Sequence, residues 1–167
     1  NKITIPNTAH FSLVNSLSIS LWVKFNSNWN YHSESLIFKG SYPMNNGWEV
    51  NVNQDDSYFG TGNYSFQSAI SKGNGPLSPN YKQSFAEINK WRHVCYTYDN
   101  RMAKIYLDGV LRDSINVSGA LLNNNNNIII GSSINPVSGT YEKLIDDVRI
   151  WNRALKPEEV TYLFTSN

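Results

Sequence analysis

The sequence predicts an all-β protein: an antiparallel two-sheet β-sandwich of the jelly-roll kind with one short C-terminal helix. Three observations predict this fold class. Many short segments alternate apolar and polar residues, as strands with one buried face do. These segments recur at intervals of about 8–15 residues, a spacing typical of sandwich folds. Stretches rich in Asn, Gly, Pro and Ser separate them, and helical periodicity is confined to the C-terminal end.

The predicted strands follow one another along nearly the whole chain. Residues 17–25 (LSISLWVKF) give the clearest one, because every second residue is a large apolar side chain. Residues 103–115 indicate a hairpin, since Asp108-Gly109 supplies the positive backbone angles that a tight turn needs. The segments expected to form strands are 2–6, 17–25, 35–40, 47–53, 63–70, 91–99, 103–115, 127–131 and part of 144–155.

The C-terminal tail has the features of a helix. Pro157 suits a first helical position, and the two glutamates that follow lie at the positive end of the helix dipole. Val160, Leu163 and Phe164 form one apolar stripe. Lys156 is a poor N-cap residue, so we expect the helix to be short.

Two stretches lack strand periodicity. Residues 71–84 contain Gly, Pro and Asn, and we expect them to form one long surface loop of a kind that is often functional. Residues 123–127 are five consecutive asparagines, which predict a low-complexity connector. No linker divides the chain, so residues 1–167 are expected to form a single domain. The start at Asn1, without a signal peptide, suggests that this domain was excised from a larger protein.

The composition argues against several classes of function. The net charge is +1 and only 16% of the residues are charged, which disfavours nucleic-acid binding and membrane-surface binding through excess positive charge. No apolar stretch approaches the length of a membrane span. Cys95 is alone, so an internal disulfide and a cysteine-based zinc site are excluded. We expect Cys95 to be a small buried apolar residue.

Asp146 and Asp147 stand side by side within a predicted strand. Strict alternation places Asp146 on one face with Val148 and Ile150, where a bare carboxylate is costly to bury. Asp147 and Arg149 share the other face and are expected to pair. Catalysis by Asp146 is disfavoured, because no second carboxylate is placed at about 5–10 Å as glycoside hydrolysis requires. We therefore expect Asp146 to hold the fold together, by accepting hydrogen bonds or by binding a metal.

The second half of the chain resembles the laminin-G-like, concanavalin A-like jelly-roll domain of bacterial exported proteins. Three motifs carry the resemblance: NKWRHVCYTYDNRMAKIYLDGVL at 89–111, IIIGS at 128–132 and LIDDVRIWNRALKPEEV at 144–160. LSISLWVKF further upstream fits the same pattern. The motifs are specific for fold rather than for function, because such domains serve as sugar-binding modules, adhesion domains and accessory parts of glycanases.

The resemblance also implies a structural calcium near Asp146 and an extracellular or cell-surface location. Two departures from the family pattern lie close to that calcium position. Lys143 stands where relatives commonly have Gly, and a strand that usually precedes residues 2–6 is either missing or was trimmed from this sequence. His93 is expected to be a buried, hydrogen-bonded imidazole.

The aromatic residues divide into two groups. Trp22, Trp48, Trp91 and Trp151 lie on strands where the family pattern expects an aromatic, so sheet packing is the expected role. Trp29 lies in a polar loop without apolar periodicity. Its ring could stack on a sugar while amides and hydroxyls bond the sugar hydroxyls, or it could fold back onto the edge of the sandwich. For the other loop groups, ordinary turn formation is the alternative.

These observations predict a non-catalytic carbohydrate-binding module of an exported glycan-degrading or cell-surface protein. Its expected partners are a polysaccharide or glycan and the neighbouring domains of a larger parent protein, without nucleic acid or membrane insertion. The candidate metal ligand is Asp146, for calcium. An adhesion or protein-interaction module is the alternative, and a jelly-roll glycanase or lyase is disfavoured. The candidate sugar-binding residues are Trp29, Tyr31, His32, Tyr42, Asn45, Asn46, Tyr58 and Tyr81.

Overall fold

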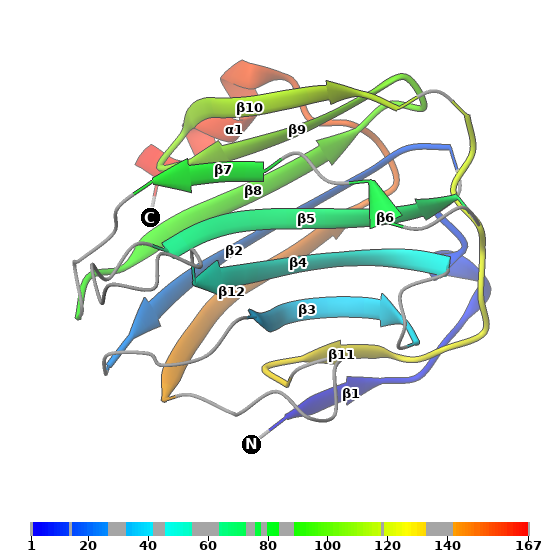
Figure 1. Ribbon diagram of the computed structural model, residues 1–167, viewed down its shortest axis with the longest axis horizontal. Coiled ribbons are helices and arrows are strands. Elements are labelled where there is room, and N and C mark those ends of the chain that lie inside the picture. Colours follow the sequence, from blue (N-terminus) through cyan, green and yellow to red (C-terminus); the bar gives the residue numbers. More distant parts are fainter. Residues whose placement is uncertain are drawn as a thin grey trace.

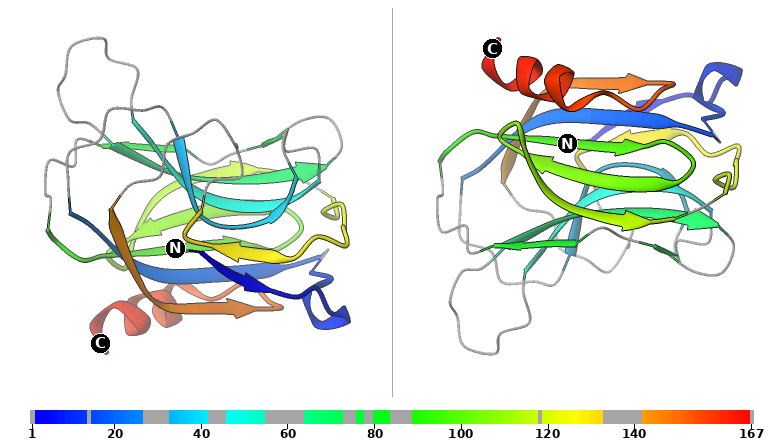
Figure 2. Two further views of the ribbon diagram at one scale, coloured as in Figure 1. Left: turned by 90° about the horizontal axis from the view of Figure 1, so that it is seen from below. Right: turned by 90° about the horizontal axis from the view of Figure 1, so that it is seen from above.

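The protein is an antiparallel β-sandwich, as predicted (Figure 1). One sheet has seven strands in the order β1-β11-β3-β4-β5-β6, with β7 also paired to β5, and the other has five in the order β10-β9-β8-β2-β12. The C-terminal helix lies on the outer face of the five-stranded sheet (Figure 2). The computed structural model describes residues 2–13, 15–26, 33–41, 46–54, 64–72, 76–77, 80–83, 89–117, 119–132 and 142–166.

The bounds of the elements follow the alternating segments closely. The seven-stranded sheet consists of β1 (Ile3–Ile5), β3 (Ser33–Gly40), β4 (Asn46–Gln54), β5 (Tyr64–Lys72), β6 (Pro76–Leu77), β7 (Asn80–Gln83) and β11 (Ile128–Ile130). The five-stranded sheet consists of β2 (Leu17–Phe25), β8 (Arg92–Tyr98), β9 (Met102–Leu107), β10 (Val110–Asn116) and β12 (Lys143–Trp151). A 3-10 turn, η1 (Ala9–Phe11), follows β1, and the helix is α1 (Pro157–Thr165).

The prediction of one long loop over 71–84 is wrong. Strand β5 continues to Lys72, and β6 and β7 both pair antiparallel with β5. These short strands escaped the sequence pattern because backbone hydrogen bonds to β5 define them, and two to four residues are too few to show an alternation.

The core lies between the two sheets and is made of the inward-facing residues of the alternating strands. It includes Leu17, Leu21 and Val23 of β2, whose exposed fraction is 0%. These residues belong to one cluster with Val50 and Val52 of β4. Closing water out of this layer supplies most of the driving force for folding.

Two charged side chains of β3 enter the core layer from opposite ends. Glu34 forms an ion pair with Lys143 of β12, and the two side chains are 0% and 4% exposed. At the other end of the strand, the buried ammonium of Lys39 donates to the backbone carbonyl of Asn124 and, at 3.0 Å, to the Asn124 side-chain oxygen. We call these ends of the sandwich the Glu34 end and the Lys39 end.

The asparagine run is part of the Lys39 end. Asn124 accepts from Lys39 and returns a hydrogen bond from its amide to the Lys39 backbone carbonyl. Asn127 accepts from the backbone N–H of Asn7, so the run ties the segment between β1 and η1 to β3 rather than serving only as a connector. Gly47 completes this end with φ +92°. A Cβ there would lie 1.8 Å from the Lys39 carbonyl oxygen, so no other residue fits.

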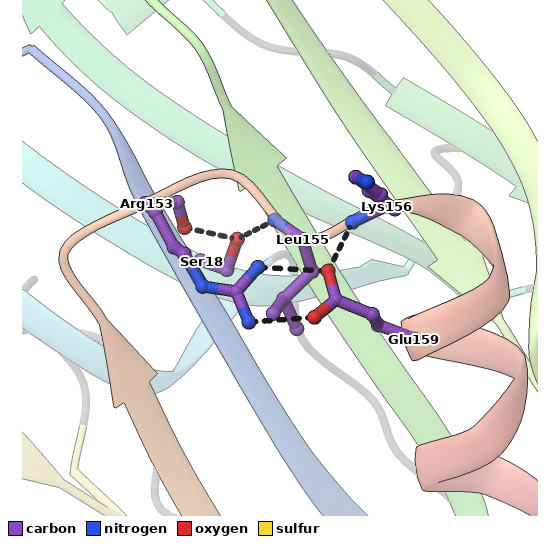
Figure 3. Close-up of polar contacts among 5 residues, drawn as sticks. All are labelled: Ser18, Arg153, Leu155, Lys156 and Glu159. Carbon is purple, nitrogen blue, oxygen red and sulfur yellow. Dashed lines mark hydrogen bonds and ion pairs between the residues drawn. The ribbon is translucent and has the colours of Figure 1, made fainter.

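Helix α1 is joined to β2 by a network of polar contacts (Figure 3). The Ser18 hydroxyl donates to the Arg153 carbonyl and accepts from the Leu155 N–H, both at 2.8 Å. The Arg153 guanidinium forms two bonds to the Glu159 carboxylate, which also accepts from the Lys156 N–H at 2.8 Å. Glu159 thus satisfies the helix start from inside the first turn, which explains how the helix begins after a poor N-cap residue.

The apolar stripe of α1 is confirmed. Val160 and Leu163 are buried against the outer face of the five-stranded sheet, where they meet Cys95 and Tyr106. Cys95 is fully buried, as predicted, and burial raises the pKa of its thiol. The five-stranded sheet therefore has an apolar layer on each face, and α1 covers only part of the outer one.

Candidate functional site

Strand β12 contains a β-bulge at the two acids. Asp146 pairs with Trp22 and Arg149 pairs with Ser20, so Asp147 and Val148 together face a single position of β2. Asp147 adopts a left-handed conformation with φ +49°, which Asp tolerates better than most residues. The extra residue reverses the alternation halfway along the strand.

The bulge overturns the predicted environment of Asp146. Ile145 before the bulge and Val148 and Ile150 after it pack against the core, so Asp146 does not share their face. Asp146 is exposed, and Leu144 beside it is 46% exposed. The prediction of a carboxylate placed among aliphatic core residues is wrong, because it assumed an uninterrupted period of two.

The two carboxylates have different partners. Asp147 accepts a hydrogen bond from the Arg149 guanidinium at 2.8 Å, which confirms the predicted pair. Asp146 accepts from the backbone N–H of Asp147 at 2.8 Å. No cation in the described part of the chain forms an ion pair with Asp146, so its carboxylate keeps acceptor capacity toward solvent.

The described residues around Asp146 do not make up a calcium site by themselves. Calcium takes six to eight oxygen ligands, often from several carboxylates and carbonyls. Within the ranges that the structure describes, no three His, Cys, Asp or Glu side chains gather as such ligands would. Calcium binding by Asp146 stays a prediction.

A hollow on the outer face of the five-stranded sheet is lined by these carboxylates and by two tryptophans. Its volume is about 430 Å³, and the described residues that line it are Trp22, Trp91, Asp146 and Asp147. We call it the Trp91 hollow. Trp91 is 37% exposed, so the prediction that it serves sheet packing is incomplete. The Lys24 ammonium lies 5.5 Å from the Trp91 ring centroid, a cation–π contact.

Helix α1 fixes the other tryptophan of the hollow. Phe164 stacks on Trp22 with ring centroids 5.8 Å apart and an interplanar angle of 24°. On β8 the imidazole of His93 lies 5.3 Å from Trp22, also measured between centroids. Trp22 is thus held between the helix and the neighbouring strand, which restricts the ring.

His93 is buried, as predicted, beneath this aromatic layer. Desolvation lowers the pKa of its imidazole to about 4, opposed by the negative charges of Asp108 and Asp147 and reinforced by the positive charge of Arg149. Its backbone N–H donates to the Asp108 carboxylate at 3.0 Å. The predicted hydrogen bond of the ring is not seen at Nδ1, which has no partner in the described structure.

A second hollow of about 680 Å³ lies where the edge strands of the two sheets face each other. It shares Asp146 and Asp147 with the Trp91 hollow. Its other described lining residues are Lys2, Ile3, Ile130, Gly131, Glu142, Lys143, Ile145 and Val148.

Four of the predicted sugar-binding residues lie outside the described residues: Trp29, Tyr31, His32 and Tyr58. The described strands next to them in the sequence are β2 and β3 and then β4 and β5. Phe25, Ser33, Gln54 and Tyr64, the strand residues nearest to the gaps, are at the Glu34 end. Trp22, Trp91 and Asp146 lie toward the Glu34 end, since Phe25 of β2 pairs with Lys143 at the start of β12 and Val23 pairs with Arg92 at the start of β8.

The other candidates are described only in part. Tyr42 and Asn45 also lie outside the described residues. Asn46 begins β4 opposite Lys72, and its buried side-chain oxygen has no described partner. Tyr81 is on β7, opposite Phe66 of β5. Sugar binding by these residues stays a prediction. The sequence missed the Trp91 hollow, whose signals were two tryptophans and the two acids of β12.

This architecture defines a lectin-like β-sandwich, a class in which a rigid two-sheet scaffold carries variable surfaces. The chain belongs to the family described as the Concanavalin A-like lectin/glucanases superfamily, whose laminin G family model matches residues 1–161. No helix in the described ranges has both the length and the apolar character to cross a membrane.

Solved structures share the fold over nearly the whole chain. Domain 4 of AbnA, a GH43 extracellular arabinanase from Geobacillus stearothermophilus determined in complex with arabinotriose, is 25% identical with a TM-score of 0.68. The comparison covers 97% of this chain and 71% of that domain. The binding domain of botulinum neurotoxin serotype G is 20% identical with a TM-score of 0.72, covering 99% of this chain and 42% of that one. At that identity the likeness shows the fold alone.

A curated human protein matches over a shorter segment. Adhesion G-protein coupled receptor D1 of Homo sapiens is 32% identical over 80 residues. The segment is 46% of this chain and 9% of the receptor, so the chain corresponds to a small part of that protein.

Proposed function

We propose that this domain is a non-catalytic carbohydrate-binding module of an exported glycan-degrading or cell-surface protein. The observation that carries the proposal is the similarity to domain 4 of the arabinanase, a domain seen with arabinotriose bound. That similarity extends over 97% of the chain at 25% identity, so it involves the whole scaffold and not one motif.

The composition and the described surface support a saccharide ligand. A near-neutral chain with few charged residues offers amides, hydroxyls and aromatic rings, which are the groups that bind neutral sugar rings. The Trp91 hollow provides aromatic surface beside carboxylate acceptors. The expected location is extracellular, beside further domains of a parent protein that present the module to a polysaccharide.

The proposal is tested by affinity gel electrophoresis on a panel of neutral and acidic polysaccharides. We expect the protein to be retarded by at least one of them, and Trp29→Ala to weaken the retardation about tenfold. Tyr162→Ala is the matched control, because Tyr162 is an aromatic residue 68% exposed on α1. Lack of retardation on every polysaccharide would contradict the proposal.

An adhesion or protein-interaction module is the second candidate. The similarity to a segment of an adhesion receptor favours it, as does edge strand β10, where Val110 and Leu111 are exposed. A protein partner held by this strand would be lost on Leu111→Lys and kept on Trp29→Ala, the reverse of the pattern expected for sugar binding.

A further inference from the structure

We propose that the Trp91 hollow is the saccharide-binding platform of this domain and that it selects a neutral saccharide with adjacent free hydroxyls. The inference rests on the proposed function and gives it a location and a ligand class. It places binding on the outer face of the five-stranded sheet, beside α1, rather than on loop aromatics alone.

The hollow offers aromatic surface that is already positioned. Trp22 is held between Phe164 and His93, so its ring does not have to be ordered when a ligand arrives. Trp91 is 37% exposed, and Lys24 contacts its ring by a cation–π interaction. The C–H face of a sugar ring stacks on such surfaces at little cost in conformational entropy.

Asp146 supplies the acceptor. Its carboxylate is exposed and receives one hydrogen bond, from the Asp147 N–H. A carboxylate has two oxygens and about four lone-pair sites, so two neighbouring hydroxyls of one sugar can donate to it together. Hydrogen bonds from hydroxyls to a charged acceptor are among the stronger ones, which makes Asp146 a specific contact.

The charge that faces the sugar hydroxyls, on Asp146, selects against acidic sugars. The Lys24 ammonium lies on the Trp91 ring and forms no ion pair with Asp146. Asp147 is paired with Arg149, whereas Asp146 forms no ion pair among the described residues. The carboxylate of a uronic or sialic acid would bring a further negative charge against Asp146 in a partly desolvated place. A neutral saccharide meets no such repulsion.

The β12 bulge is what makes this arrangement possible. It turns Asp146 outward, directly opposite Trp22, while Ile145 and Val148 on either side of the acids still pack against the core. The acceptor and the aromatic ring thus sit on paired positions of adjacent strands, where side chains on one face are about 5 Å apart at Cβ. That separation suits a single sugar ring spanning both.

The test uses the full chain and isothermal titration with arabinotriose, together with affinity electrophoresis on arabinan, xylan, β-glucan and polygalacturonic acid. We expect Trp91→Ala and Asp146→Asn each to weaken binding of the best neutral glycan about tenfold. Trp91→Phe, which keeps an aromatic ring, should weaken it less. Tyr162→Ala and Glu158→Gln are the matched aromatic and carboxylate controls and should bind as the parent protein does. Thermal melting confirms that each variant is folded.

The outcomes separate this inference from the proposed function. If Trp91→Ala and Asp146→Asn bind a neutral glycan as tightly as the parent protein does, the assignment of the Trp91 hollow as the binding platform is overturned. The proposed function would still stand. Tighter binding of polygalacturonic acid than of every neutral glycan would overturn the selection by charge. Failure of the parent protein to bind any of the glycans would overturn both. Should Trp91→Ala not fold, Trp91→Phe and Asp146→Asn decide the question.

Discussion

The two ends of the sandwich bury a charge of β3 in different ways. At the Glu34 end the carboxylate meets an ammonium, Lys143, from the opposite sheet. At the Lys39 end the ammonium meets neutral oxygens of Asn124, and desolvation lowers the pKa of Lys39. The first arrangement links two sheets by a charge pair, and the second links a strand to a connecting segment by hydrogen bonds.

The two ends should therefore respond differently to mutation. A buried pair compensates its own desolvation only while both partners remain, so removing one leaves an unpaired charge in the core. Replacing Lys39 removes the charged partner of its contact with Asn124. The Asn124 oxygens that remain are neutral, so leaving them without a donor costs a moderate amount of stability. The Glu34 end is therefore the more vulnerable of the two.

The largest effect is expected from Glu34→Leu. It leaves the Lys143 ammonium buried without its partner and should lower the free energy of unfolding by about 3–5 kcal/mol, measured by urea denaturation. Adding Lys143→Met should recover a large part of that loss, because the pair is then replaced by apolar side chains. A loss below about 1 kcal/mol for Glu34→Leu would show that the pair contributes little.

Lowering the pH is expected to reduce the free energy of unfolding through protonation of His93. The pKa of His93 in the folded protein, about 4, lies below its ordinary value of 6.5, so the unfolded chain takes up a proton that the folded one does not. The stability held at pH 7 should fall as the pH drops from about 6.5 to about 4, by up to about 3 kcal/mol.

The contribution of His93 is isolated by comparison with His93→Gln across that pH range. Other groups titrate in both proteins, so the difference between the two free energies of unfolding reports His93. We expect the parent protein to lose more stability than the variant between pH 7 and pH 4. A difference that does not change with pH would exclude His93 as the group responsible.

The smallest effect is expected from Lys39→Met at the opposite end. The variant relieves the burial of an ammonium but leaves the Asn124 carbonyl without its donor, so we expect a loss of about 1 kcal/mol. Urea denaturation beside Glu34→Leu measures the contrast directly. If Lys39→Met proved as costly as Glu34→Leu, neutral acceptors would be as important to this fold as the ion pair.

Local patterns in the sequence were sufficient to predict the strands from their alternation, the hairpin from Asp108-Gly109 and the helix after Lys156 from Pro157 and the apolar stripe. They succeeded because these features depend on residues within a few positions of each other. The Glu34–Lys143 pair could not be found that way, since its partners are 109 residues apart in the chain. Which strands meet, and in which register, is set by packing that a single local pattern does not contain.

Sequence patterns carry less information about the candidate site than about the fold. The aromatic loop residues were selected by composition, which does not tell which segments lie close together, and their role stays a prediction. Asp146 was assigned to the core because a bulge has no sequence signal beyond a residue that tolerates positive φ, here Asp147. Trp91 looked like a packing residue because the predicted strand 91–99 included it, whereas it directly precedes β8 and is 37% exposed. The sequence pattern says nothing of how far α1 extends over the sheet.

The one extra residue in the β12 bulge determines which side chains of the strand face the core and which face solvent. The register shift at Asp147 decides which side chains on either side of it face solvent. Inserting or deleting one residue there would therefore turn exposed side chains of one half of the strand inward and buried ones outward, without altering any other amino acid. Diversification of this face can therefore proceed through changes in length as well as through changes in identity, and variants of either kind should be considered when its recognition properties are engineered.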